Sequence, residues 1–522
     1  MLRKKWSFFE DRNRNFNNIS RYFKLNQAVD SNKFILDDRT WKDLDLDIVF
    51  SQIDRTLTIP GEQILYSLLR QPILRMKELS ERLRLINLFS FNKEIREKLQ
   101  IFLTQLGRKR GEYLVDMLWD EIPHYKKFTI LYNYPLVVIP ILIFLIVLNY
   151  NNVALFGFII IFLVNVIIHF RTKYKISEEL NSIFYLGKLI HCASNLVYIE
   201  HSEFNLYRAY LKKALKKTSK ITKKTSLIVR GENNFVYDYF NIFFLVEVRA
   251  FYSVLSLVKK YKKQLQEIFK TIGHLDAMIS VSSYRAGLTE YVEPKFNNSS
   301  FYIKTEEIVH PLLKDPISNS ITVKSNGILI TGSNMSGKTT FLKTIGVNLV
   351  LGQTINTCLA RKFESQFFKI YTMIGREDNI IEGKSYYLDE VSALLRIVKT
   401  INKEPSRLCL LDELFRGTNS IERISASSEI LLYLAKQGFC IFATTHDLEL
   451  TRLVNSHFCN YHFQEDIQDY GIAFTFKIRK GVSSTRSAIS LLRYLDYPKE
   501  ITSAAEKKIQ TIKEFSKFSI EE

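Results

Sequence analysis

The chain has 522 residues, 46% of them hydrophobic and 24% charged, which excludes a disordered chain and allows two or three domains with sizeable cores. Lys and Arg (73) exceed Asp and Glu (54) by 19, and this excess favours a polyanionic neighbour, either nucleic acid or an anionic membrane face. The five cysteines are scattered without C-x-x-C spacing, which argues against a disulfide framework or a zinc site and suits a reducing compartment.

The N-terminal part of the chain is predicted to be helical after a polar start. Residues 1–35 are rich in Asn and Arg and lack periodicity, and the first ten residues contain no apolar segment typical of a cleaved signal peptide. Apolar residues then recur at helical spacing from residue 36 to about residue 125, as in Ile64, Leu65 and Leu68. This second region, 36–125, is expected to form the core of a helical bundle.

Two uncharged apolar stretches follow within residues 126–175. Residues 129–148 carry no charge over twenty positions, and residues 153–170 carry none over eighteen when His169 is counted as neutral. A helix of twenty residues is about 30 Å long, which is the thickness of the hydrocarbon core of a bilayer. A four-residue connection joins the two stretches, so we expect a transmembrane helical hairpin. The alternative is a buried helical hairpin in a large soluble core.

Positive charges predict the orientation of this hairpin. The connection between the two stretches has no Lys or Arg, whereas both flanks do: Lys126, Lys127, Arg171, Lys173 and Lys175. Because loops rich in Lys and Arg stay on the cytoplasmic side, both long arms of the chain are expected in the cytoplasm. The expected location is therefore the cell (inner or plasma) membrane, with a multi-pass topology.

The region 176–300 is again predicted to be helical, and it contains a basic run. Seven lysines occur among the thirteen residues from Lys212 to Lys224. They could bind the phosphates of a nucleic acid or anionic lipid headgroups, and they could equally form a solvated helix face. No aromatic residue interrupts the run, so stacking on nucleic-acid bases is not indicated.

Residues 327–340 have the pattern of a phosphate-binding loop between a strand and a helix. Residues 332–339 fit G-x-x-x-x-G-K-[ST] without a mismatch. Gly332 and Gly337 let backbone N–H groups approach phosphate oxygens, Lys338 can reach the β- and γ-phosphates, and the Thr339 hydroxyl can ligate Mg²⁺. A chance match in a Gly/Ser turn is disfavoured by the flanking strand and helix. The predicted nucleotide-binding residues are Gly332, Ser333, Asn334, Met335, Ser336, Gly337, Lys338, Thr339 and Thr340.

Two further strands are predicted to end at residues that could act on a nucleotide. In the region 301–522 strands and helices alternate, as in a parallel-sheet α/β nucleotide-binding domain. One apolar strand ends in Asp412, which suits Mg²⁺, and Glu413, which suits a base that orients the attacking water. Another apolar strand leads to His446, which can sense or hydrogen-bond the γ-phosphate or the water. A purely structural histidine is the alternative.

These motifs together resemble the MutS-type DNA mismatch-repair ATPases. The phosphate loop, with its Asn-Met pair, and the segments 411–420 and 443–446 are similar to that family's phosphate loop, acid strand and Ala-Thr-His strand end. The segment 382–385 resembles the loop whose serine, here Ser385, reaches the nucleotide of the partner subunit. Weaker likenesses, including residues 53–56 and Leu275-Asp276, indicate the family's helical core and lever regions.

The resemblance implies a dimeric ATPase, and the departures from the family's pattern limit which other properties of the family are expected here. By resemblance, two subunits associate head to head through their ATPase domains, each binding ATP and Mg²⁺, and DNA is a partner. Only about 35 residues precede the helical core, so the family's mismatch-reading and connector domains are not expected. The apolar hairpin 129–170 stands where the family's levers would run to a DNA clamp.

The expected protein is therefore a P-loop α/β domain of MutS-like type, preceded by an all-α core and lever region that carries a transmembrane hairpin. Its expected function is that of a membrane-anchored MutS-like ATPase that hydrolyses ATP as a homodimer and is coupled to DNA binding. The alternative is a membrane scaffold or mechanochemical ATPase with no nucleic-acid ligand.

Overall fold

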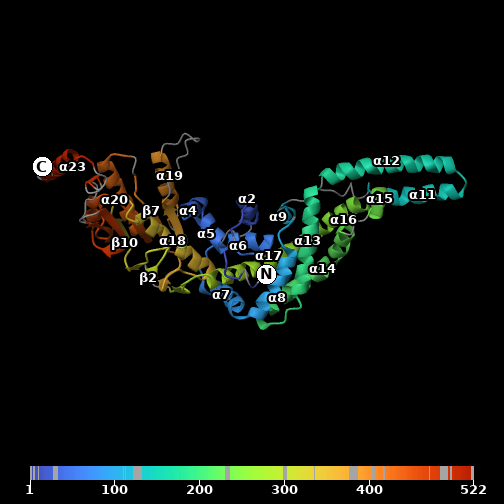
Figure 1. Ribbon diagram of the computed structural model, residues 1–522, viewed down its shortest axis with the longest axis horizontal. Helices are drawn as coiled ribbons and strands as arrows, with labels where there is room; N and C mark the ends of the chain where they lie inside the picture. Colours follow the sequence, from blue (N-terminus) through green and yellow to red (C-terminus); the bar gives the residue numbers. More distant parts are fainter. Residues whose placement is uncertain are drawn as a thin grey trace. The chain divides into compact units, whose positions relative to one another are not determined.

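The computed structural model describes most of the chain as two compact units (Figure 1). One unit consists of Met1–Lys33, Ser51–Leu68 and Arg82–Gly287, and the other of Phe34–Phe50, Leu69–Glu81 and Leu288–Glu522. The predicted helical region 36–125 is thus divided between them. The described residues are 3, 6–9, 11–27, 33–109, 111, 113–120, 132–175, 177–229, 235–297, 302–333, 335–374, 386–401, 406–415, 418–468, 471–482, 489, 492–493 and 497–518.

The first unit is helical throughout its described residues. Helices α5 (Leu46–Ile53), α6 (Ile59–Arg70) and α7 (Met76–Phe91) contain residues of both units. The other helices of the first unit are α2 (Phe16–Ile19), α3 (Arg21–Asn26), α8 (Lys93–Leu106), α9 (Leu114–Trp119), α11 (Pro135–Val147), α12 (Asn151–Lys175), α13 (Ser177–Leu196), η2 (Ser202–Phe204), α14 (Asn205–Val229), α15 (Phe235–Phe244), α16 (Val246–Lys260) and α17 (Lys262–Ala286).

A buried carboxylate joins two segments of this unit that are far apart in the sequence. Asp276 of α17 is fully buried and accepts hydrogen bonds from the backbone N–H groups of Leu57 and Thr58 and from the Thr58 hydroxyl, at 2.6 to 3.1 Å. These donors lie just before α6, where backbone N–H groups lack helical partners. Gly61 lies directly against the Asp276 carboxylate, where a side chain would collide with it. The carboxylate therefore caps α6 and ties it to α17.

The apolar hairpin differs from the sequence-based expectation in its first helix. Figure 1 shows α11 and α12 running side by side, and Gly157 of α12 packs closely on Leu142 of α11. Within the described residues, one helical segment, Asn151–Thr172, is long and apolar enough to cross a membrane. The predicted span 129–148 is shorter as a helix, because α11 begins with Pro135 at its N-terminus, a position that proline favours, and residues 129–131 lie outside the described part.

The second unit contains two β-sheets, which matches the predicted α/β class. The smaller sheet has the order β1-β5-β2-β3 and the larger one β10-β9-β4-β8-β7-β6. The strands are β1 (Lys295–Phe296), β2 (Ile303–Ile308), β3 (Asn319–Val323), β4 (Gly327–Thr331), β5 (Lys362–Ser365), β6 (Lys369–Met373), β7 (Arg407–Asp412), β8 (Phe439–Thr444), β9 (Phe458–Gln468) and β10 (Gly471–Lys480). The helices are α4 (Asp38–Asp43), α18 (Lys338–Ile355), α19 (Tyr386–Val398), α20 (Ser420–Lys436), α21 (Leu448–Leu453) and α23 (Lys499–Phe518).

The larger sheet places the ends of its central strands at one edge. Strands β4, β8 and β7 are parallel neighbours, and their apolar residues are almost entirely buried, as expected for a sheet covered on both faces. Helices α19 and α20 pack on one face, with Ile397 and Leu431 in the same apolar cluster as Cys409 and Ile441. Parallel strands bring their carboxyl ends together, so the residues that follow β4, β7 and β8 converge.

Candidate nucleotide-binding site

The predicted phosphate loop forms a tight turn between β4 and α18. Gly332 and Gly337 have φ values of 146° and 105°, in the region that favours glycine, and an added Cβ at Gly332 would contact Ser336 and Phe463. Met335 also has a positive φ, 69°, and its side chain is 80% exposed. The loop backbone is thus wound tightly enough to present its N–H groups to an anion at the N-terminus of α18.

Lys338 is buried at the start of α18 and crosses the loop. Its ammonium donates to the carbonyl oxygens of Gly332, at 2.9 Å, and Ser333, at 2.7 Å, and its side chain is only 4% exposed. The Glu413 carboxylate lies 3.9 Å away. A buried ammonium held in this way keeps its positive charge beside the loop, where phosphate oxygens of a nucleotide would lie.

Thr339 and Asp412 come together as a pair of oxygen donors. The Thr339 hydroxyl donates to Asp412 Oδ2 at 2.9 Å, and the Thr444 hydroxyl donates to the other carboxylate oxygen. Hydroxyl and carboxylate oxygens are the ligands that Mg²⁺ prefers, and the ion usually completes its shell with phosphate oxygens and water. The described residues contain no group of three or more His, Cys, Asp or Glu side chains that could hold a metal alone. The pair therefore fits a Mg²⁺ ion that arrives with a nucleotide.

Glu413 and His446 are directly hydrogen-bonded across the ends of β7 and β8. His446 Nε2 lies 2.7 Å from Glu413 Oε1 and 3.4 Å from the Lys338 ammonium. One nitrogen cannot both donate to Glu413 and accept from Lys338, and the shorter contact identifies the hydrogen bond to Glu413. Glu413 has a φ of 49°, a left-handed conformation that is costly for this residue type, and its N–H donates to Thr444. Strain of this kind is typical of residues held for a function.

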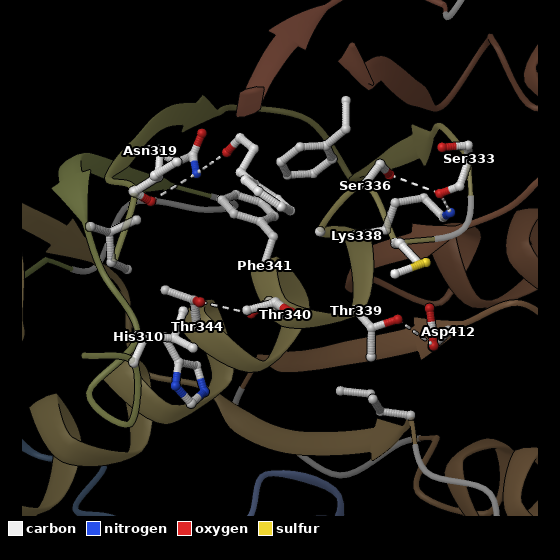
Figure 2. Close-up of a pocket in the computed structure, with 18 of the residues that line it drawn as sticks. His310, Asn319, Ser333, Ser336, Lys338, Thr339, Thr340, Phe341, Thr344 and Asp412 are labelled. Carbon is white, nitrogen blue, oxygen red and sulfur yellow. Dashed lines mark hydrogen bonds between the residues drawn. The ribbon is translucent and has the colours of Figure 1, made fainter. Parts of the chain in front are cut away.

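A cavity of about 580 Å³ extends from the phosphate loop into an apolar recess. Figure 2 shows the loop residues Ser333, Ser336 and Lys338 at one end and Asn319 and His310 at the other. The recess is lined by the apolar side chains of Ile308, Leu313, Ile317, Phe341, Phe463 and Phe476. Its volume and mixed lining are those of a small-molecule site, with anion-binding groups at one end and apolar surface at the other.

Sequence reasoning missed the residues that form this recess. Asn319 of β3 donates to the Phe476 carbonyl at 3.0 Å and accepts from the Ile478 N–H at 2.8 Å, which ties β3 to β10. Burial lowers the pKa of His310 to about 4, so its imidazole is neutral near pH 7. Asn319 begins β3, whereas His310 lies in the segment that follows β2.

Sequence reasoning also missed an ion pair beside His446. Arg423 of α20 donates two hydrogen bonds to Asp447, the residue after His446. The hydrogen bond to Asp447 is the main cause that raises the pKa of Arg423, and the charge of Glu413 contributes. The position of Asp447 directly after His446 was the one signal in the sequence that could have pointed to this ion pair. The N-terminus of α20 is capped by the Asn419 side chain, which accepts a hydrogen bond from the Ile421 N–H.

The structure brings together most of the predicted site residues. Lys338, Thr339, Asp412, Glu413 and His446 converge at one edge of the larger sheet. Gly332, Ser333, Met335, Ser336, Gly337 and Thr340 surround them in the loop and the first turn of α18. Asn334 and Ser385 lie outside the described residues.

Comparison with known proteins connects this geometry to one family. Residues 328–513 match the family model MutS domain V. Similar curated proteins are named DNA mismatch repair protein MutS: that of Thermotoga maritima is 30% identical over 269 residues (50% of this chain, 33% of the relative), and that of Prochlorococcus marinus strain MIT 9312 is 29% identical over 290 residues (52% and 31%). That of Thermosipho melanesiensis is 29% identical over 292 residues (52% and 35%). The chain spans about a third of the length of these relatives.

Proposed function

We propose that this chain, which is MutS-like over about half of its length, binds ATP with Mg²⁺ and hydrolyses it as a membrane-anchored homodimer coupled to DNA. The observation that carries the proposal is the convergence of Lys338, the Thr339–Asp412 pair and the Glu413–His446 pair beside one cavity. These groups supply what phosphoryl transfer needs, which is charge, position and an oriented water.

The residues of the site divide these tasks. The loop N–H groups and the dipole of α18 bind the phosphates, and Lys338 exchanges its carbonyl partners for phosphate oxygens. Thr339 and Asp412 would hold Mg²⁺, which supplies positive charge for the phosphate oxygens when it is bound. Glu413 accepts a proton from the attacking water, and His446 holds the Glu413 carboxylate in place through its Nε2–H.

Glu413→Gln tests this assignment in the full chain. The amide preserves the size of the side chain and removes the base, so ATP binding is expected to remain while steady-state hydrolysis falls by about 100-fold or more. Fluorescent ATP binding and phosphate release measure the two quantities separately. Glu422→Gln is a control for the loss of one carboxylate charge, because Glu422 is an exposed residue of α20 outside the cavity lining. Unchanged hydrolysis in the Glu413 variant would reject its role as the base.

An exposed apolar stripe on α19 supports association of two ATPase domains. Tyr387, Leu388, Val391 and Leu395 recur at helical spacing and are 36 to 50% exposed. They directly follow the segment that contains Ser385, the residue that by resemblance reaches the partner's nucleotide. Exposed apolar side chains in a row are common at protein–protein contacts. If the site closes between two copies, ATP added to the Glu413→Gln variant increases the dimer fraction in analytical ultracentrifugation.

The exposure of the apolar hairpin supports anchoring in a membrane. Only 22% of the most apolar window of α12 is buried, whereas the core helix of a soluble protein is mostly buried. Exposed apolar residues also run along α11, among them Val137, Phe144 and Val147, at 61 to 73%. Apolar surface of this extent would cost free energy in water and is favourable in a bilayer.

Coupling to DNA rests on the net charge of +19 and on the likeness to MutS. Binding of the full chain to duplex DNA across a salt series measures it, since each phosphate contact makes the affinity fall with salt. Absence of binding at about 50 mM salt, with ATP hydrolysis intact, would favour the second candidate. That candidate is a membrane scaffold or mechanochemical ATPase without a nucleic-acid ligand, which the exposed hairpin also fits.

A further inference from the structure

Helix α14 presents an unusual row of lysines on one face. Lys212, Lys213, Lys216, Lys217 and Lys220 are all exposed, and we call these five residues the lysine face. The opposite face is buried in the helical unit through residues at helical spacing: Leu211, Ala214, Thr218, Ile221 and Thr225. The lysine face is therefore carried by a packed helix, which fixes the spacing of the five residues along its backbone.

The structure distinguishes these five lysines from Lys224 of the same run. The Lys224 ammonium donates to the Ser253 hydroxyl and is half-buried, so its charge is partly used inside the unit. The five lysines of the face, by contrast, form no ion pair with any acid within the described residues. Five exposed positive charges that are not paired with acids within the described residues make a surface of positive potential.

The spacing of the lysine face matches a polymer of phosphates. Lys212, Lys216 and Lys220 lie four residues apart, so successive ammonium groups are about 6 Å apart along the helix, and the face is about 12 Å long. Duplex DNA carries one phosphate per about 1.7 Å of its axis when both strands are counted. A face of this length therefore lies opposite several phosphates. Ser219 is also exposed between the lysines, and a hydroxyl can donate to a phosphate oxygen.

The burial pattern of α14 disfavours a lipid surface as its partner. A helix that lies on a bilayer inserts its apolar face among the acyl chains. The apolar face of α14 is already used, because Ala214, Ile221 and the other buried residues pack inside the unit, and Thr225 contacts Gly187 of α13. The exposed surface of α14 that a partner could contact is therefore charged and has few apolar groups. Such a surface suits a polyanion in water better than the surface of a lipid bilayer.

We propose that the lysine face of α14 binds the sugar–phosphate backbone of duplex DNA without reading its sequence. The proposal rests on the DNA coupling proposed above and adds the surface that carries it. The run contains no aromatic side chain for base stacking, and lysines are flexible point charges that do not distinguish bases as a guanidinium fork does. Binding is therefore electrostatic, independent of sequence and strongly dependent on salt.

The test uses the full chain in phosphatidylcholine nanodiscs and a short fluorescent duplex of mixed sequence. One variant replaces all five lysines of the face by glutamine. A control variant removes the same charge from five other exposed lysines: Lys77, Lys324, Lys399, Lys436 and Lys499. We expect the face variant to lose at least about tenfold in affinity. The slope of log K against log salt should become shallower by about 3 to 4.5, since each of up to five contacts contributes about 0.9. The control variant should change affinity by less than about twofold.

Each alternative has its own signature. If the wild-type chain binds DNA and the face variant binds equally well, the lysine face is not the DNA contact. The lysine-face proposal then fails, while the proposed coupling to DNA stands. If the wild-type chain does not bind DNA, the proposed DNA coupling fails with it, while ATP hydrolysis measured on the same sample remains a separate result. Lysine acylation followed by mass spectrometry tests the remaining alternative, which is that the lysine face contacts anionic lipid. Protection of the face by phosphatidylserine in the nanodisc, and not by DNA, would assign it to lipid and overturn the proposal.

Discussion

The guanidinium of Arg423 donates two hydrogen bonds, of 2.9 and 2.7 Å, to the carboxylate of Asp447. Asp447 directly follows His446, and its own N–H donates to the Thr445 hydroxyl at 3.0 Å. A planar guanidinium that binds a carboxylate at two points fixes the orientation of both groups. Arg423 thereby attaches the turn that carries His446 to helix α20, and it is a positioning residue for the Glu413–His446 pair.

Loss of this ion pair is expected to slow hydrolysis without preventing ATP binding. Arg423→Ala should lower kcat by about tenfold and change KM by less than about threefold, because His446 would no longer hold Glu413 steadily. Steady-state kinetics over a range of ATP concentrations measures both constants. The double variant Arg423→Asp with Asp447→Arg should recover part of the lost kcat if the pairing itself matters. An equal loss of activity and of folded structure in Arg423→Ala, seen by thermal melting, would instead indicate a purely structural role.

Lys338→Ala is expected to remove nucleotide binding. The ammonium is buried beside the loop and contributes a charge-assisted contact to phosphate, so its loss should weaken ATP binding by about 100-fold, or about 2.7 kcal/mol. Equilibrium titration with a fluorescent ATP analogue measures the change. Lys343→Ala, five residues later on α18, removes a lysine that pairs with Asp45 at 2.6 Å and should leave affinity nearly unchanged. Similar losses in both variants would point to damage to α18.

Gly61→Ala is expected to destabilise the helical unit. An added Cβ would collide with the Asp276 carboxylate that caps α6, so the cap would be displaced at a cost of about 2 to 4 kcal/mol. Thermal unfolding of the full chain reports the change as a lower Tm. A double-mutant cycle with Asp276→Ala provides the control, because the alanine substitution should cost much less where the carboxylate is already absent. Additive effects would show that Gly61 and Asp276 do not interact as described.

Acid is expected to destabilise the protein through His274. Burial, with a smaller effect of Arg82, lowers the pKa of His274 to about 3, so the folded state keeps the ring neutral while the unfolded chain takes up a proton below about 6.5. Stability should therefore fall as pH drops from about 6.5 towards 3, by about 2 kcal/mol at pH 5 from this group. His274→Phe keeps a ring against Tyr207 and removes the proton. Urea unfolding at pH 7.5 and 5 should show a smaller pH effect in this variant, and an equal effect would contradict the assignment.

A charge in the middle of α12 is expected to disturb anchoring. Leu163 is 56% exposed on the apolar helix, and Leu163→Arg would place a charge near the bilayer centre at a cost of about 2.5 kcal/mol or more. Alkaline extraction of membranes should release more of this variant than of the wild type. Leu206→Arg is a matched control, since Leu206 is 62% exposed on α14, outside the hairpin. Complete release of the wild-type chain by alkali would count against a membrane anchor.

Local patterns in the sequence were sufficient to predict the loop between β4 and α18 and the strand ends that lie beside it. Two glycines spaced five residues apart, followed by Lys338 and Thr339, form a local pattern between a strand and a helix, and such a pattern can be recognised without knowledge of distant contacts. The apolar strands that end at Asp412 and His446 were also readable, since buried parallel strands are almost continuously apolar. The structure confirms the strands, the loop and their convergence.

Contacts between distant segments were decided only by the tertiary structure. The Glu413–His446 bond, the Arg423–Asp447 pair and the Asp276 cap join residues separated by 24 to 219 positions, and each depends on how strands pair or helices pack. Sequence alone identified seven lysines in a basic run, and the packing of α14 shows that five of them share an exposed face while Lys224 is half-buried. Local propensity depends on near neighbours, whereas burial and pairing depend on the whole fold. The long-range contacts and the exposure of the lysine face could therefore be identified only from the structure.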